Sequence, residues 1–374
     1  MRLSLNLVWE SISKWCLYLA IFLIPIFFLP WTLYSVNLNK QTLLITLVLL
    51  AFIAWLIKSI SQGEFVCARS PINVLVGLLI IFVAFSAWFS GARSIGFSGS
   101  SGAEPDTFIN ILSFGLLYIL LTSMLNEERE FNRVFKLLSW SSLLLVVFSL
   151  LQLFSIWLLP WAFTKDPTFN PIGASNALAI YLGFVFAVAL AALYLGSRDF
   201  SRLLKIVLVI LAVLAFLGVL LIAYWPVFAG LILAMLLLVI ADLQRRGAEA
   251  SRGMLLPVAI IALSLFMILS SFGLITFSLP SLALPAEITP SLKASWAIGQ
   301  NTILAGAKNF ILGSGPATYQ YQYGFYREAA LNQSLFWNLR FSQGFNALLT
   351  HLVNWGAAGT VIFLLLLLLL VLLM

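Results

Sequence analysis

Long apolar runs separated by short polar segments dominate the pattern of residues along this chain. Ten of the runs come close to the roughly 20 residues that an α-helix needs to cross a bilayer. They cover residues 15–34, 41–60, 72–90, 108–125, 137–158, 174–195, 204–223, 226–241, 255–277 and 352–373. The pattern predicts an all-α integral membrane protein, a polytopic bundle of about ten transmembrane helices.

One segment, residues 279–351, is too long and too polar to be a simple connector between two spans. We therefore expect three parts: a transmembrane bundle over 1–278, a loop domain with amphipathic helices over 279–351, and a further transmembrane helix over 352–374. The last eleven residues are almost all leucine and lack the charged flank that normally ends a span. We expect additional helices beyond Met374.

Composition and charge support a membrane location. Hydrophobic residues make up 62% of the chain, charged residues 9%, and the mean hydropathy is +1.08. The net charge of +7 could indicate a nucleic-acid partner. However, thirteen basic residues fall in the N-terminus and alternate loops, against three in the opposite short loops. This asymmetry predicts a cytoplasmic N-terminus and an extracytoplasmic 279–351 loop, with no nucleic-acid partner.

Few residues offer metal or redox chemistry. The chain has two cysteines, Cys16 and Cys67, and one histidine, His351, so neither a disulfide framework nor a metal site is expected. The ten runs also lack buried acidic or basic side chains, which counts against ion-coupled transport.

The loop begins with an amphipathic pattern over residues 291–310, which predicts one helix lying on the membrane surface. Its apolar stripe holds Leu292, Trp296, Ile303 and Phe310, and the neighbouring stripe holds Lys293, Gln300 and Lys308. The lysines could face lipid headgroups or a lipid-linked pyrophosphate.

A Gly-Ser-Gly-Pro turn at 313–316 follows, and then an aromatic stretch with two arginines. Arg327 and Arg340 are candidates for phosphate clamps, because a guanidinium stays charged and binds in a bidentate way. Both could equally be ordinary surface arginines. The aromatic side chains suit either a sugar platform or an interfacial belt. They are Tyr319, Tyr321, Tyr323 and Trp337.

Another polar group opens the sixth run. Gly173, Asn176 and Tyr181 fall near its outer end, where free backbone N–H groups could meet an anion. Helix capping by Ser175 or Asn176 alone explains part of this pattern.

Several short motifs together resemble the O-antigen ligase and O-antigen polymerase superfamily. The motifs are Gly173-x-x-Asn176-x-x-Ala179-x-Tyr181-Leu182, the pair Lys293 and Trp296, the turn glycines Gly313 and Gly315, and the series Asn346, Leu349, Gly356 and Gly359. The resemblance implies a fold of the GT-C type in the bacterial inner membrane. It also implies transfer of a glycan from undecaprenyl pyrophosphate to a glycan or lipid acceptor on the outer face, with no metal and no cofactor.

The chain departs from the family pattern at three places. Phe345 stands where the family usually has a histidine, Trp225-Pro226 where it often has Ser-Arg, and Lys293 where it often has Arg. Phenylalanine cannot act as a base. His351 lies about 240° away around a helix and is a poor replacement.

These observations give two sets of candidate residues. The catalytic candidates are Arg327, Arg340, Glu328 and His351, with Glu287 as a further alternative. The substrate-binding candidates are Lys293, Lys308, Arg327, Arg340, Asn176, Asn346, Tyr319, Tyr321, Tyr323 and Trp337.

Three functions remain open from the sequence. The first is a glycan ligase or polymerase homologue. The second is a transporter or flippase of a small solute or lipid-linked sugar. The third is an inactive glycolipid-binding scaffold, which the Phe345 and Trp225-Pro226 departures favour.

Overall fold

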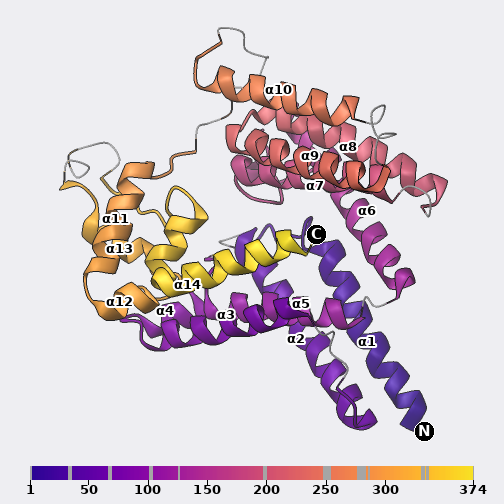
Figure 1. Ribbon diagram of the computed structural model, residues 1–374, viewed down its shortest axis with the longest axis horizontal. Coiled ribbons are helices and arrows are strands. Elements are labelled where there is room, and N and C mark those ends of the chain that lie inside the picture. The colour runs from indigo at the N-terminus through magenta and orange to yellow at the C-terminus, as the bar shows by residue number, and fades with distance from the viewer. Residues whose placement is uncertain are drawn as a thin grey trace. The chain divides into compact units, whose positions relative to one another are not determined.

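The computed structural model describes residues 2–32, 36–65, 70–100, 104–124, 127–196, 200–246, 254–275, 284, 287–329, 333 and 337–373. Among these residues the only regular secondary structure is helical, and there is no strand (Figure 1). The helices are α1 (Arg2–Leu23), α2 (Asn37–Gln62), α3 (Pro71–Trp88), α4 (Arg93–Ser98), α5 (Phe108–Met124), α6 (Glu128–Leu153), η1 (Ala162–Thr164), α7 (Ser175–Leu195), α8 (Arg202–Ile222), α9 (Trp225–Arg246), α10 (Leu255–Ser271), α11 (Leu292–Leu304), α12 (Ala307–Leu312), α13 (Tyr319–Tyr326) and α14 (Ala347–Leu372).

Seven helices are long and apolar enough to cross a membrane: α2, α3, α6, α7, α8, α9 and α14. Two shorter apolar helices, α5 and α10, have 17 residues each. Together these nine correspond to the second to tenth predicted runs. The prediction of a multi-pass helical membrane protein is therefore confirmed.

The first predicted run, 15–34, is wrong as a single helix. Its helix, α1, begins much earlier, at Arg2, and ends at Leu23. The chain then turns, and the backbone N–H groups of Ile26 and Phe27 both donate to the carbonyl of Leu23. Pro25 explains this end, because proline disfavours helical geometry at the residue before it.

The eighth predicted run, 226–241, is shorter than its helix. α9 continues past the expected end at residue 241 and includes Asp242, whose side chain is buried. Sequence hydropathy placed this carboxylate just outside the span. Asp242 lies four residues before the end of α9, so the predicted absence of charged side chains near the middle of the spans stays a prediction.

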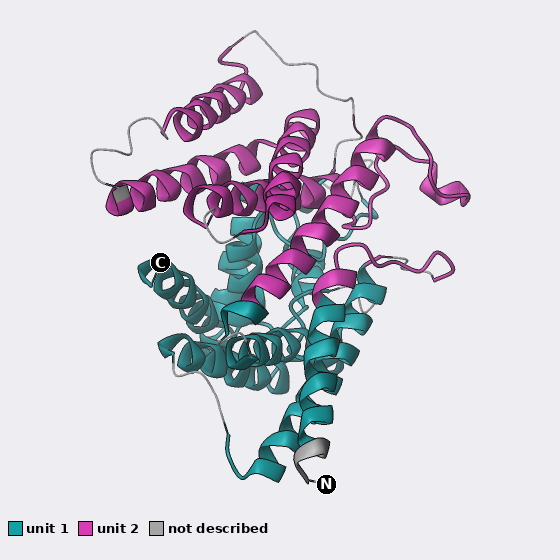
Figure 2. Cartoon of the chain, turned by 90° about the vertical axis from the view of Figure 1, so that its right-hand side faces the viewer, with its two compact units in different colours: residues 1–20, 37–130, 288–374 teal, residues 21–36, 131–287 magenta. Residues whose placement is uncertain are grey.

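The chain divides into two compact units (Figure 2). Unit 1 comprises residues 1–20, 37–130 and 288–374, and unit 2 comprises residues 21–36 and 131–287. These units group residues that contact one another. They do not test the boundaries predicted at residues 278 and 351 between the transmembrane parts and the loop domain, which stay predictions.

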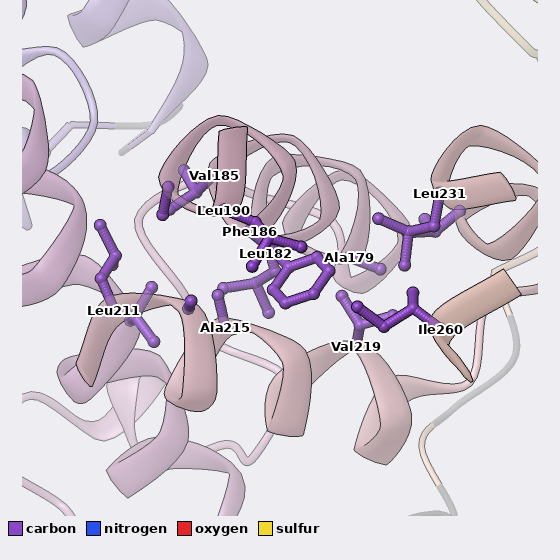
Figure 3. Packing of buried hydrophobic residues seen from close by; sticks show 14 of the residues in the cluster. Ala179, Leu182, Val185, Phe186, Leu190, Leu211, Ala215, Val219, Leu231 and Ile260 are labelled. Atoms are coloured by element: carbon purple, nitrogen blue, oxygen red, sulfur yellow. The ribbon is translucent and has the colours of Figure 1, made fainter. Parts of the chain in front are cut away.

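Unit 2 has a core of large apolar side chains between α7, α8 and α9, with small residues at the helix contacts (Figure 3). Phe186 of α7 stacks on Phe216 of α8, with ring centroids 4.8 Å apart. Ala179 and Ala215 are fully buried beside them. Small residues let helix backbones approach closely, and packing of this kind is what holds helices together in lipid.

Unit 1 contains the short helices of the loop region, which we define as residues 288–346. Within it, α11 and α12 contact α14, and α12 also contacts α3. In Figure 1 these short orange helices gather around one end of α3 and α14. The polar part of unit 1 therefore lies at the ends of two membrane-span candidates.

Candidate functional site

α14 is broken at Gly356, where the backbone takes φ 66° and ψ −170°. A break in a helix leaves carbonyl groups without their usual partners. Here the turn at 313–316 supplies replacements: the N–H of Ser314 donates to the carbonyl of Val353 at 2.9 Å, and that of Gly315 to Asn354 at 3.0 Å. The turn and the helix break therefore form one backbone unit.

Gly313 and Gly356 touch each other across this contact. A Cβ on Gly313 would lie 2.5 Å from backbone atoms of Asn354 and Gly356. A Cβ on Gly356 would lie 2.5 Å from the backbone nitrogen of Gly313. Both residues have positive φ, 72° and 66°. Only glycine satisfies both conditions, which gives a physical reason for these two glycines in the sequence.

Buried hydroxyl groups fix the same turn to the end of α3. Ser86 donates to the carbonyl of Leu312 at 2.7 Å, and Ser90 to that of Ser314 at 2.9 Å. Ser314 in turn donates to Val353 at 3.0 Å and lies 2.6 Å from the hydroxyl of Thr318. Buried polar groups satisfied in this way make a rigid layer.

A buried carboxylate, that of Asp106, also supports the turn. The Asn354 side chain donates to Asp106, and the backbone of Ala317 also hydrogen-bonds to this carboxylate. Burial raises the pKa of Asp106, and these hydrogen bonds oppose part of that rise. Ala317 has φ 56°, a strained conformation for a residue other than glycine. The Asp106–Asn354 pair therefore helps to hold a strained turn in place.

Removing the Asn354 side chain tests this support. Asn354→Ala leaves a buried carboxyl without one of its donors, and we expect a loss of about 1–3 kcal/mol in the free energy of unfolding. Asn301→Ala, at an exposed position of α11, is the matched control and should change little. Thermal unfolding in detergent measures both, and equal effects would show that the pair carries no special stability.

A polar pocket of about 340 Å³ lies against the turn. It is lined by Ser90, Gly91, Ala92, Lys308, Asn309, Ser314, Thr318, Tyr321 and Gln322. Partial burial lowers the pKa of the Lys308 ammonium group. Two of the predicted binding residues, Lys308 and Tyr321, thus line one pocket.

The predicted helix over 291–310 is two helices. Gly306 has extended backbone angles, φ 159° and ψ 162°, and separates α11 from α12. α11 buries a face of small and polar residues, including Ser295 and Gly299. Leu292 and Trp296 face outward, 54% and 56% exposed, and Lys293 is exposed beside them. The apolar stripe is therefore an outer surface.

The aromatic stretch is helical, and this changes the predicted sugar platform. Tyr319 and Tyr323 are four residues apart in α13, so they share its inner face and are buried with Ile298 and Val353. They present no free ring to a ligand, which corrects the prediction for both. Tyr321 and Trp337 are exposed.

The two arginines lie apart from the pocket lining. Arg327 donates from Nη1 to the carbonyl of Trp337 at 2.7 Å, and Arg340 and Glu328 are exposed. Their predicted roles at a phosphate or in catalysis stay predictions.

Two further candidate residues, Asn346 and His351, lie at or near the start of α14. Asn346 caps the helix, because its Oδ1 accepts from the N–H of Leu349 at 2.9 Å. Phe345 has an exposed ring, and its N–H donates to Ser295 Oγ at 2.8 Å. His351 stacks on Trp355 with ring centroids 3.9 Å apart and does not line the pocket.

Asn176 belongs to unit 2, whereas the loop region belongs to unit 1, so a shared binding site of Asn176 with the loop candidates stays a prediction. Its N–H donates to the carboxylate of Glu287 at 3.0 Å. Ala174, not Ser175 or Asn176, occupies the cap position of α7. The capping alternative is therefore wrong, and an internal carboxylate meets the helix N-terminus.

Within the described ranges, no group of three or more His, Cys, Asp or Glu side chains could hold a metal ion. Cys67 lies outside those ranges. Sequence reasoning missed Ser86, Ser90, Asp106 and Asn354, which join segments far apart in the chain. Comparisons with protein-family models, with curated proteins and with solved structures find no match to this chain.

Proposed function

We propose that the chain is a membrane glycan ligase or polymerase homologue of GT-C-like fold in the bacterial inner membrane. It would transfer a glycan from a polyprenyl-pyrophosphate carrier on the outer face, using residues 279–351 as an extracytoplasmic loop domain. The observation that carries the proposal is the polar pocket beside the broken helix α14, within a membrane protein.

The chemistry of the loop region supports this proposal. A glycan needs hydroxyl and amide partners, and the pocket supplies both kinds together with a lysine. Leu292 and Trp296 give α11 an apolar outer face that suits the bilayer interface, where a lipid-linked donor would lie. A departing diphosphate would need cations, and Lys293, Arg327 and Arg340 are the candidates.

No residue is assigned as the catalytic base. Phe345 cannot accept a proton, and His351 is packed against Trp355. Asp106 is buried behind the turn and is engaged by Asn354. Arg327, Arg340, Glu328 and His351 remain the catalytic candidates.

Alanine substitution of the arginines tests the proposal. We expect Arg327→Ala and Arg340→Ala each to abolish glycan transfer in cells that lack a redundant enzyme, because each removes one of the two guanidinium groups that would clamp the diphosphate. Glycan ladders on gels measure transfer. Arg202→Ala, at an exposed position opening α8, is the control and should keep normal ladders. Normal ladders in both test variants would contradict the proposal.

A transporter or flippase is the second candidate function, and the break in α14 favours it. Broken helices with buried polar groups often form substrate sites in transporters, and Asn354 is a buried polar residue at this break. Flipping of a lipid-linked sugar in reconstituted vesicles, without glycan transfer, would select this function. Binding without flipping or transfer would select an inactive scaffold.

A further inference from the structure

We propose that the polar pocket is a subsite for one acidic sugar residue, whose carboxylate or phosphate group pairs with Lys308. The inference rests on the proposed function, because it takes the ligand to be part of a glycan. It goes further by assigning the kind of sugar and the side chains that recognise it.

The residues that line the pocket fall into two groups. The first group is a floor of hydroxyls, Ser90, Ser314 and Thr318, that bond to one another or to backbone carbonyls. These groups are already satisfied within unit 1, and they are buried. The floor therefore shapes the pocket and leaves ligand recognition to other residues.

The second group is a rim of four polar side chains: Lys308, Asn309, Tyr321 and Gln322. Among the residues that the structure describes, none of these side chains has a hydrogen-bond partner. The two amides each offer donors and an acceptor, and Tyr321 offers a half-exposed ring and a hydroxyl. Amides match the hydroxyls of a sugar ring, and an aromatic face matches its C–H groups.

The size of the pocket limits the ligand. Ligand pockets range from about 300 to 1,000 Å³, so 340 Å³ lies near the lower end of that range. A single small polar ring fits this space better than an extended chain. The contact between Gly313 and Gly356 fixes the adjacent turn, so the pocket is formed before a ligand arrives.

The charge of the lining points to an acidic ligand. Lys308 is the one charged residue among the nine that line the pocket. The nearby carboxylate of Asp106 is buried behind the turn and is engaged by Asn354 and Ala317. Partial burial disfavours the charged form of Lys308, and an anion beside it would reverse this effect. Lys308 is exposed at the rim of the pocket, so with a neutral sugar its ammonium group would pair only with solvent.

Binding of small probes to the full chain in nanodiscs tests the inference. The probes are methyl β-D-glucopyranoside, methyl β-D-glucuronide, glucose 6-phosphate and inorganic phosphate, with dissociation constants taken from saturation-transfer NMR titrations. We expect one of the two acidic sugars to bind at least about tenfold more tightly than the neutral glycoside, since hydrogen bonds to charged groups are the stronger ones. Whether the glucuronide or the phosphate binds better identifies the acidic group.

Variants distinguish the role of the Lys308 charge in binding from effects of removing any lysine from the protein. Lys308→Gln should reduce the affinity for the acidic sugar to that for the neutral glycoside, and Lys308→Arg should retain the preference. Lys136→Gln, at an exposed position of α6, is the matched control and should bind like the unchanged protein. Tyr321→Ala should weaken all three sugars.

Three results would overturn the inference: equal binding of acidic and neutral sugars, no binding of any sugar, or inorganic phosphate binding as tightly as the tighter of the two acidic sugars. The arginine variants keep the proposed function separate. Lost glycan ladders in those variants, with no sugar binding here, would reject only this subsite. Sugar binding here with normal ladders in those variants would reject only the transfer role.

Discussion

Replacing Gly356 with alanine is expected to destabilise unit 1 severely. The new Cβ would lie 2.5 Å from the backbone nitrogen of Gly313 and 2.6 Å from the carbonyl oxygen of Ile311. Backbone atoms cannot swing away as a flexible side chain can, so the turn or the helix must move. The backbone at φ 66° and ψ −170° is in a region open essentially only to glycine, which adds about 1–3 kcal/mol of strain for alanine. We expect a total loss of about 3–5 kcal/mol, measured by thermal unfolding in detergent.

Two further glycine variants show whether the loss of stability comes from the backbone contact between Gly313 and Gly356. Gly313→Ala should be as harmful, because it would disturb the same backbone contact. Gly77→Ala should be neutral or stabilising by up to about 1 kcal/mol, because a Cβ there meets nothing within 4 Å and alanine favours helix. If Gly356→Ala unfolds at the temperature of the unchanged protein, the backbone contact between the turn and α14 is not required for folding.

Much of the helical layout follows from the sequence because the length of an apolar run is itself the physical requirement for crossing a bilayer. Nine of the ten predicted runs correspond to helices on this basis. Helix ends follow different physics. Hydropathy continued the first run through Pro25, where backbone geometry ends α1, and it stopped short of Asp242, which α9 includes. Composition cannot locate such ends, since capping and proline geometry decide them.

The candidate site was less predictable because its contacts join distant segments. Ser90 bonds to a residue 224 positions away, and Asn354 to one 248 positions away. No local pattern carries that information. The glycines of the turn and of α14 were visible as motifs, yet their contact with each other was not.

The tyrosines show a different kind of error. Alternating aromatic residues suggested one shared outer surface, but in a helix the residues at spacing four share a face. Tyr319 and Tyr323 therefore became part of a core, while Tyr321 reached the pocket. Once the segment is known to be helical, the spacing alone places Tyr319 and Tyr323 on one face and Tyr321 on another.

Phe186→Ala is expected to give the largest loss of stability in unit 2. Phe186 is 5% exposed and stacks on Phe216 with an angle of 28° between the rings, so alanine leaves a cavity among rigid neighbours. In lipid the loss is mainly one of packing contacts, and we expect about 3 kcal/mol.

Phe184→Ala is the control, since Phe184 is on the same helix but 57% exposed, and its ring makes fewer contacts within the protein. We expect it to cost less than about 1 kcal/mol. Thermal unfolding of both variants in one detergent measures the difference. Equal losses would mean that the α7–α8 contact does not limit the stability of unit 2.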